Sequence, residues 1–184
     1  ERDLEGVRII EIDNFYKTTV GKLSKIIQSF SKYYLTKPIA EVGEGLERAL
    51  YATYLSFLPR EKIAFSLPIN KDERGIFVEV LKTRKSGQFS FLTAHPGYTR
   101  GQHYHHTKNE QFLVISGEAE FNFKNLISNE TFTISTNGDE PKVVQTIPGW
   151  IHNIKNVGKN DLVVMLWANE LFDPKNPDTT SAEI

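Results

Sequence analysis

Four residues with metal-binding side chains stand in two short stretches of this chain. His103, His105 and Glu110 lie within eight residues of one another, and His152 follows about forty residues later. The residues around His103 have the pattern of a β-strand, on which side chains alternate between two faces, so His103 and His105 should point the same way. Glu110 opens the next strand after a short turn and can fold back beside them. Imidazoles and a carboxylate together form a typical ligand set for a transition metal.

The composition limits the partners and the kinds of metal site. The 184 residues include 22 basic and 23 acidic ones, a net charge of −1, which argues against a nucleic-acid partner or a polybasic membrane surface. There is no cysteine, so a metal must be held by His, Asp or Glu. No apolar run approaches the length of a membrane span. Because the chain begins at Glu1 and its only methionine is Met165, we expect a fragment or processed product that resides in the cytoplasm.

The first sixty residues have a different pattern from the rest. We expect a short strand over residues 7–12 and then a helix that Thr18 or Thr19 caps and whose apolar residues follow helical spacing. A second helix is expected over residues 42–57, ending before Pro59.

From Ile63 onward, short strand patterns are separated by turns, with no helical pattern between them. We expect strands over residues 63–67, 76–82, 89–94, 102–106, 111–116, 118–123, 131–134, 142–147 and 162–167. This spacing is typical of an antiparallel sandwich or barrel, so the fold class is mostly β, preceded by a small helical segment. The tail over residues 171–180 is rich in proline and polar residues and is expected to wrap the surface.

The two ligand-bearing stretches resemble the two motifs of the cupin superfamily. The spacing of the first motif is met by Gly97, His103, His105, Glu110 and Gly117. The second motif is met in part by Pro148, Gly149, His152 and Asn156, with the proline one place later than usual. The resemblance covers about residues 63–170.

This resemblance implies a double-stranded β-helix, or jelly-roll, barrel with a metal at its mouth. The ligands that it implies are His103, His105, Glu110 and His152. His106 has the opposite strand parity and is not expected to bind the ion. The alternative is a polar cavity lined by these histidines without a metal, as in cupin-like proteins that have lost it.

A further segment resembles dTDP-4-keto-6-deoxyhexose 3,5-epimerases, which are also cupin barrels. Residues 72–79 are similar to their Asp-x-Arg-Gly-x-Phe-x-Glu segment, and residues 100–104 to their Arg-Gly-x-His-Tyr segment. The resemblance implies that Arg74 and Glu79 help to hold a sugar nucleotide. Arg74 and Arg100 suit a diphosphate, because a guanidinium is a fixed, always-charged fork of donors. The alternative is that Arg74 and Glu79 form an exposed ion pair.

The same resemblance creates a conflict over His103. In those epimerases the corresponding histidine is the proton-abstracting base, but a ring that binds a metal is poorly placed to act as a free base as well. His105 stands where those enzymes usually carry glutamine, which favours a metal site here. We therefore interpret His103 as a ligand.

Several longer runs look like the C-terminal half of bifunctional capsule or O-antigen enzymes of the CapF type. They are residues 103–114, 146–154 and 167–174, and residues 50–59 resemble the junction between the two halves of those enzymes. In that family an N-terminal reductase domain acts at C-4 with NADPH, and a zinc-carrying cupin domain epimerises C-3 on the route to UDP-N-acetyl-L-fucosamine. The resemblance implies that residues 1–60 are a helical remnant of the reductase domain and that residues 61–184 are the cupin domain.

The expected function is therefore C-3 epimerisation of a UDP-4-keto-6-deoxy-N-acetylhexosamine with zinc or another divalent transition metal. Lys82, Tyr104 and Lys108 are candidates for proton transfer, and a solvated surface position is the alternative for each. A homodimer is expected because the edge of an open barrel can pair. Two other classes stay open: a cupin that binds sugar or metal without turnover, and a cupin dioxygenase, since the same ligands suit iron.

Overall fold

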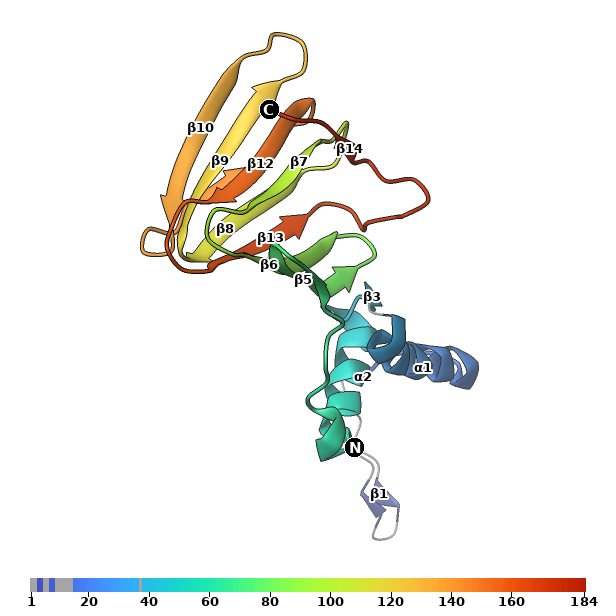
Figure 1. Cartoon of the computed structure of the whole chain (residues 1–184). Helices are drawn as coiled ribbons and strands as arrows, with labels where there is room; N and C mark the ends of the chain where they lie inside the picture. The colour runs from blue at the N-terminus through green and yellow to red at the C-terminus, as the bar shows by residue number, and fades with distance from the viewer. Residues whose placement is uncertain (1–2, 5–6, 9–14, 37) are drawn as a thin grey trace.

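In the computed structural model, which describes residues 3–4, 7–8, 15–36 and 38–184, two helices precede a barrel of two facing β-sheets (Figure 1). The helices are α1 (Val20–Thr36) and α2 (Gly45–Ser56), followed by the 3-10 turn η1 (Arg60–Lys62). They lie together outside the barrel, beside the end of the sheet that carries β3 (Pro38–Ile39). The mostly β fold with a helical start that the sequence predicts is confirmed.

The two helices hold each other through aromatic side chains. The hydroxyl of Thr19 accepts a hydrogen bond from the Lys22 N–H at 3.2 Å, so Thr19 caps α1 as one of the two predicted residues. Phe30 is 1% exposed, and its ring lies 5.1 Å from that of Tyr51 and 5.5 Å from that of Tyr54. Residues 9–12 of the strand expected over residues 7–12 lie outside the described residues, and the described part, β2 (Val7–Arg8), pairs with β1 (Asp3–Leu4).

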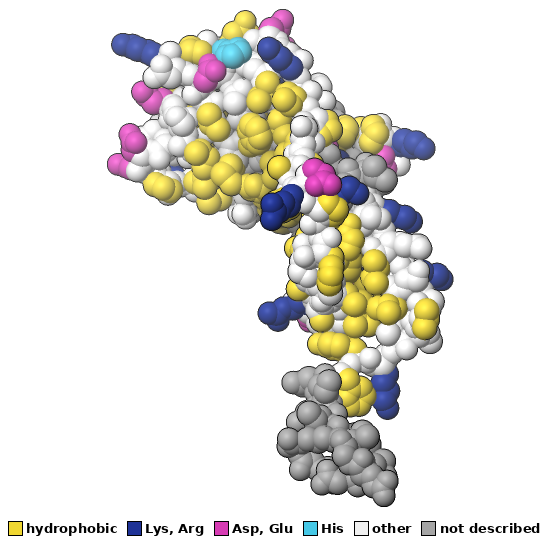
Figure 2. All heavy atoms as spheres, turned by 90° about the horizontal axis from the view of Figure 1, so that it is seen from below, with side chains coloured by type: hydrophobic (Ala, Val, Ile, Leu, Met, Phe, Trp, Pro, Cys, Tyr) yellow, Lys and Arg dark blue, Asp and Glu magenta, His cyan; other side chains and the backbone are white. Residues whose placement is uncertain are grey.

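Many apolar side chains of the helical part remain at the surface, where Figure 2 shows them gathered over the helices and the adjoining barrel face. Val20 is 85% exposed and Phe57 83%. The others in this part are Phe15, Tyr16, Ile27, Leu55, Ile63, Phe65 and Ile69. Large exposed apolar patches are typical of surfaces at which proteins contact one another. No described helix is long and apolar enough to cross a membrane.

The described barrel strands form a five-stranded and a seven-stranded sheet. The first has the order β10 (Thr131–Asn137), β9 (Glu118–Asn125), β12 (Trp150–Asn156), β7 (Thr99–Tyr104) and β14 (Thr180–Ser181). The second has the order β11 (Val143–Gln145), β8 (Glu110–Ser116), β13 (Leu162–Ala168), β6 (Gln88–Ala94), β5 (Gly75–Thr83) and β3, with β4 (Asn70–Asp72) also paired to β5. The pairs are antiparallel except for β3 with β5.

The core fills the space between the two sheets. Strict alternation along β6 and β13 buries every second side chain, as a strand with one face on a core requires. The seven-stranded sheet contributes Leu92, Phe112, Val114, Val164 and Leu166, and the five-stranded sheet contributes Ala119, Phe121, Phe123 and Ile154. This packing keeps the two walls of the barrel at a fixed separation, which positions the side chains at its mouth.

One expected strand is absent, and the central strand β12 is not among the expected ones. Residues 63–67 form no strand in the described structure, because Phe65 packs on Tyr33 of α1 at a ring distance of 6.0 Å and Pro68 has no N–H to pair. The sequence pattern also fails to predict β12. This central strand is buried on both faces, so polar and apolar residues do not alternate along it. Its polar residues His152 and Asn153 are adjacent and both buried, which hides the strand from a search for alternation.

Candidate metal centre and pocket

A β-bulge in β7 determines which of its side chains reach the barrel interior. Where β7 pairs with β12, Gly101 lies opposite Asn153 and His103 lies opposite His152, so Gln102 is an extra residue. The backbone of Gln102 has a φ of 64°, unusual for a residue with a side chain. The bulge therefore shifts the alternation of β7 by one position.

Gly101 allows the two strands to approach closely at this bulge. Its φ of 93° lies in the left-handed region, and an added Cβ would stand 2.9 Å from the carbonyl oxygen of His152. Strict alternation would send Arg100 and His103 to opposite faces, because they are three positions apart. With the bulge, both line the same cavity.

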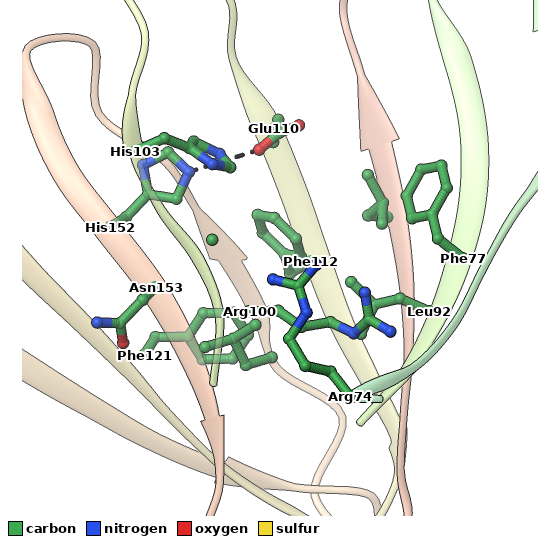
Figure 3. A pocket seen from close by; sticks show the side chains of 13 residues that line it. Arg74, Phe77, Leu92, Arg100, His103, Glu110, Phe112, Phe121, His152 and Asn153 are labelled. Carbon is green, nitrogen blue, oxygen red and sulfur yellow. Dashed lines mark ion pairs between the residues drawn. The ribbon is translucent and has the colours of Figure 1, made fainter. Parts of the chain in front are cut away.

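Three of the four predicted ligands, His103, Glu110 and His152, line one end of this cavity (Figure 3), and the fourth, His105, lies beside them. One ligand atom from each of His103, His105, Glu110 and His152 lies within 4.8 Å of the others. His105, Glu110 and His152 are only 1%, 6% and 4% exposed. Oε2 of Glu110 lies 3.3 Å from Nε2 of His105 and 3.5 Å from Nε2 of His152. Two strands of one sheet and the start of a strand in the other thus meet at this cluster.

The hydrogen-bonding pattern of the cluster fits a bound cation. Among the described residues, the buried Nε2 atoms of His103 and His152 have no hydrogen-bond partner, which is rare for buried polar atoms. His105 donates its Nδ1–H to the backbone carbonyl of Asp178, so in a neutral ring the Nε2 lone pair faces the Glu110 carboxylate. A divalent transition metal would satisfy these nitrogens and separate the two facing acceptors.

The charge states of the cluster also suit a metal. Burial, and after it the neighbouring His152, lowers the pKa of His103 to about 4, although Glu110 opposes the shift. Burial alone would raise the pKa of Glu110, but its close contacts with the rings of His105 and His152 and the charge of Lys108 hold that pKa well below its ordinary value. At neutral pH His103 is therefore neutral and Glu110 ionised, the forms in which these groups bind metals.

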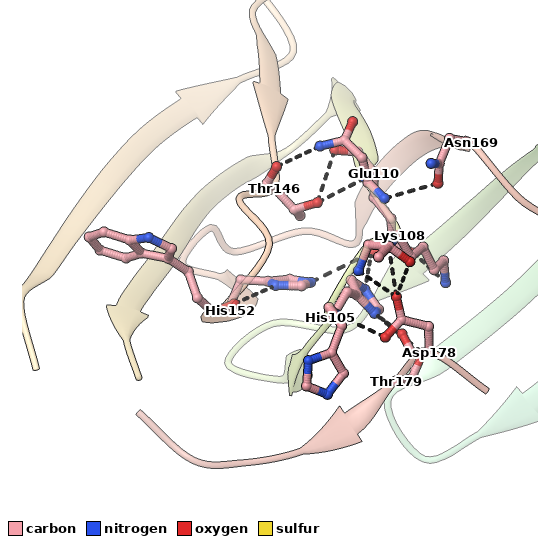
Figure 4. A network of polar contacts seen from close by, with 12 residues as sticks. His105, Lys108, Glu110, Thr146, His152, Asn169, Asp178 and Thr179 are labelled. Atoms are coloured by element: carbon pink, nitrogen blue, oxygen red, sulfur yellow. Dashed lines mark hydrogen bonds and ion pairs between the residues drawn. The ribbon is translucent and has the colours of Figure 1, made fainter. Parts of the chain in front are cut away.

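Contacts around Glu110 fix its orientation (Figure 4). Its backbone N–H donates to the hydroxyl of Thr146 at 2.8 Å, and its carbonyl accepts from the Thr146 N–H at 2.9 Å. The ammonium of Lys108, with its side chain 11% exposed, lies 3.0 Å from Oε1. One carboxylate oxygen is thereby held by Lys108, and the other faces the histidines.

The cluster opens into two adjoining cavities. The inner one has a volume of about 260 Å³ and an apolar wall that includes Leu92, Phe112, Phe121 and Leu166. The outer one, about 550 Å³, shares Arg74, Arg100, His103 and Glu110 with it and extends to Glu79, Lys108, Phe172 and Thr179. Volumes of this order and a mostly apolar lining with a few convergent polar groups are typical of small-molecule sites.

Arg74 and Arg100, the predicted substrate residues, stand together at the junction of the two cavities (Figure 3). Arg100 is 8% exposed, and its Nε donates to the carbonyl of Thr93 at 2.7 Å. One terminal nitrogen of Arg100 lies 3.5 Å from a carboxylate oxygen of Asp72 and has no hydrogen-bond partner in the described structure. Arg74 is more exposed, and its hydrogen bond to Asp72 is the main cause that lowers the pKa of that carboxyl to about 2.

The alternative in which Arg74 and Glu79 form an ion pair is wrong. Glu79 pairs with Lys82 at 2.8 Å, whereas Arg74 pairs with Asp72 at 2.6 Å. Glu79 nevertheless lines the outer cavity, as its predicted role requires.

The three candidates for proton transfer lie in different surroundings. Among the described residues that line the two cavities, Lys108 is the one candidate present. Lys82 is tied to Glu79, and the ring of Tyr104 lies 5.4 Å from that of the exposed His106. Tyr104 thus has the outward parity that a strand alternating after the bulge predicts.

Asp178 is a site residue that the sequence does not reveal. Its carboxylate accepts hydrogen bonds from the backbone N–H groups of His106, Thr107 and Lys108 at 2.8, 2.7 and 2.8 Å. Burial opposes ionisation, yet these bonds together hold the pKa of Asp178 well below its ordinary value. It stands in the polar tail, far along the chain from the histidine motif, so no local spacing signals its role.

Comparisons with known proteins agree with the fold and show the family. Residues 70–180 match the sequence pattern of the polysaccharide biosynthesis C-terminal domain family. A UDP-2-acetamido-2,6-beta-L-arabino-hexul-4-ose reductase of Pseudomonas aeruginosa is 51% identical over 175 residues, which are 95% of this chain and 47% of that protein. The capsular polysaccharide assembling protein CapF of Staphylococcus aureus superimposes with a TM-score of 0.90 at 38% identity, over 98% of this chain and 50% of that one.

The chain spans about half the length of these two relatives. A more distant match is the oxalate decarboxylase of Lactobacillus farciminis, with a TM-score of 0.51 at 17% identity over 62% of this chain and 33% of that one. That similarity concerns the fold alone. The predicted cupin fold and the predicted resemblance to CapF-type proteins are confirmed.

Proposed function

We propose that this chain, which belongs to the polysaccharide biosynthesis C-terminal domain family, is a metal-dependent epimerase domain acting at C-3 of a UDP-4-keto-6-deoxy-N-acetylhexosamine. The observation that carries the proposal is a four-ligand cluster within 4.8 Å at the end of a cavity that Arg74 and Arg100 also line. The relatives support this choice of pathway, since one is named a UDP-2-acetamido-2,6-beta-L-arabino-hexul-4-ose reductase and the other a capsular polysaccharide assembling protein. We place the reaction in capsule or O-antigen synthesis in the cytoplasm.

Inversion at C-3 requires that a proton leave carbon on one face and return on the other, and the C-4 ketone makes that proton acidic. His103, His105, Glu110 and His152 would hold zinc or another divalent metal, which as a Lewis acid supplies stabilisation for negative charge on the ketone oxygen. The apolar inner wall excludes water, which strengthens every charge interaction at this end of the cavity.

The arginines provide the binding site for the diphosphate. Arg100 is held by Thr93 and keeps a buried terminal nitrogen free of hydrogen bonds among the described residues. Arg74 stands at the entrance, where Asp72 orients its guanidinium. Two guanidinium groups at one junction match the charge and geometry of a diphosphate. The sugar would then extend from the outer cavity toward the cluster.

Lys108 is our candidate for proton transfer. Its ammonium lies 3.0 Å from Glu110 and lines the outer cavity, so it stands between solvent and the ligand cluster. A second group must act on the opposite face of the sugar, and Lys82 and Tyr104 would have to leave their present contacts to do so.

The helical part, residues 1–60, is proposed to belong to a reductase domain of the longer protein, with residues 61–184 as the epimerase domain. The exposed apolar side chains of the helices, such as Val20 and Phe57, would then be covered by that domain. We further propose a homodimer, for which the edge strand β10 offers unpaired backbone groups.

The proposal is tested by NMR of the UDP-4-keto sugar incubated with metal-analysed protein. We expect the C-3 epimer to form, and H105A to lose both the bound metal and the activity. H106A is the matched control, because the His106 side chain is exposed, and it should keep both. Metal binding without turnover would support the binding cupin instead, and oxygen uptake by iron-loaded protein would support a dioxygenase.

A further inference from the structure

The C-terminal tail crosses the mouth of the barrel from one sheet to the other (Figure 1). It leaves the seven-stranded sheet after β13 and joins the edge of the five-stranded sheet as β14, where Ser181 lies opposite His103. Near its start, the Asn169 N–H donates to the carbonyl of Asn109 at 3.1 Å, and the Asn109 N–H donates to the Asn169 side chain at 2.9 Å. The tail is therefore attached on both sides of the metal cluster.

Near the end of this crossing, two residues before β14, Asp178 makes two different kinds of contact (Figure 4). Its carboxylate accepts four hydrogen bonds from one turn: the N–H groups of His106, Thr107 and Lys108 and the hydroxyl of Thr107 at 3.0 Å. Its backbone carbonyl accepts the Nδ1–H of His105. The side chain thus holds the turn that connects two ligands, and the main chain holds the ring of one of them.

We propose that Asp178 is a positioning residue for the metal centre. A carbonyl can only accept, so the bond to Asp178 requires a hydrogen on Nδ1 of His105 and, in the neutral ring, leaves Nε2 as the metal-binding atom. The bonds to the turn hold the backbone of Lys108, whose ammonium occupies Oε1 of Glu110 and leaves Oε2 toward the histidines. One residue thereby sets the orientation of two ligands from the side away from the ion.

This inference rests on the metal site of the proposed function, and it does not depend on which reaction the metal serves. A purely structural strap would hold the tail without affecting the ring of His105. The two roles are distinguished by the protonation pattern of that ring and by metal affinity, neither of which requires turnover.

The test compares D178A, D178N and the control D173N in the 184-residue chain. Asp173 lies in the same tail, where its carboxylate accepts only the local Lys175 N–H at 2.9 Å among the contacts described, and asparagine can keep that bond. Zinc dissociation constants are measured by chelator competition, the His105 tautomer by nitrogen-15 NMR of the metal-free chain, and folding by circular dichroism and thermal melting.

We expect D178A to bind zinc about 10- to 100-fold more weakly than the wild type, as is typical when a partner of a metal ligand is removed. Alanine keeps the backbone carbonyl of residue 178 but loses the carboxylate bonds that hold it beside the turn, so the carbonyl should move away from His105 and the Nδ1–H signal should be lost or averaged. D178N keeps acceptor capacity on one oxygen only and should lie between D178A and the wild type, whereas D173N should match the wild type.

Equal zinc affinity and an unchanged tautomer in folded D178A or D178N would overturn the inference and leave the proposed metal site intact. If the wild type itself binds no zinc, the metal site and this inference are both overturned. If D178A does not fold, D178N decides: weaker zinc binding with a wild-type melting temperature supports positioning, and unchanged binding contradicts it.

Discussion

Replacing Glu110 by glutamine should destabilise the metal-free chain by about 3 kcal/mol, because the change leaves the charge of Lys108 without its partner. The two side chains are 9% and 11% exposed, and the charged atoms are 3.0 Å apart. At an effective dielectric constant of about 20, their attraction is about 5 kcal/mol before desolvation is subtracted. Removal of one partner of such a buried pair costs about 3–5 kcal/mol, and we take the lower end because glutamine can still accept a hydrogen bond.

A double-mutant cycle isolates the pair from the rest of the cluster. E110Q, K108M and the double variant are unfolded with urea in the presence of a chelator, and tryptophan fluorescence and circular dichroism are followed. K108M in the E110Q background should recover part of the loss, giving a coupling energy of about 1–3 kcal/mol. The control cycle uses E41Q and K85M. The ion pair of Glu41 and Lys85 is slightly shorter, at 2.8 Å, but its side chains are 58% and 77% exposed, so the cycle should show no measurable coupling.

A small effect of E110Q on the free energy of unfolding, with normal cooperativity of the unfolding transition, would contradict this prediction. If E110Q costs less than about 1 kcal/mol and its cycle matches that of the exposed pair, Lys108 does not hold Glu110 in solution. The proposed division of the carboxylate, with one oxygen for lysine and one for the metal, would then be wrong.

Three further predictions follow from other parts of the site. G101A should destabilise the chain by about 1–3 kcal/mol more than G97A, since both glycines have positive φ but only Gly101 would place a Cβ against β12; equal unfolding free energies would contradict this. R74Q should raise KM for the UDP-sugar about tenfold or more with little change in kcat. The control R60Q, at an exposed position, should leave KM unchanged, and an effect of R74Q on kcat alone would exclude a binding role for Arg74. In the metal-free chain, the His103 pKa near 4 lies below its ordinary value, so the unfolded state binds more protons than the folded state. The free energy of unfolding should therefore fall by up to about 3 kcal/mol as the pH drops from about 6.5 to 4. Urea titrations of H103N should lack this part of the pH dependence.

The ligand cluster could be predicted from the sequence because its spacing is local. His103, His105 and Glu110 occupy one strand, its end and the start of the next, where alternation and a short turn bring side chains together. His152 came from the resemblance to a family motif. Its strand shows no polar and apolar alternation because both faces are buried.

Other features depend on contacts that no local pattern encodes. Arg100 and His103 line the same cavity because Gln102 forms a bulge in β7, whereas strict alternation predicts that they lie on opposite faces of the strand. Asp178 reaches the site only because the tail crosses from β13 to β14. Long-range packing, and not the identity of the residues, decides each of these.

The most direct test of the central claim is incorporation of solvent deuterium at C-3 of the UDP-4-keto-6-deoxy-N-acetylhexosamine as metal is titrated into chelated protein. We expect exchange to be absent without metal, to rise with occupancy to one ion per chain and to stay absent in H105A. Exchange at C-3 that persists in the metal-free chain would contradict this claim and would restore His103 as a free base.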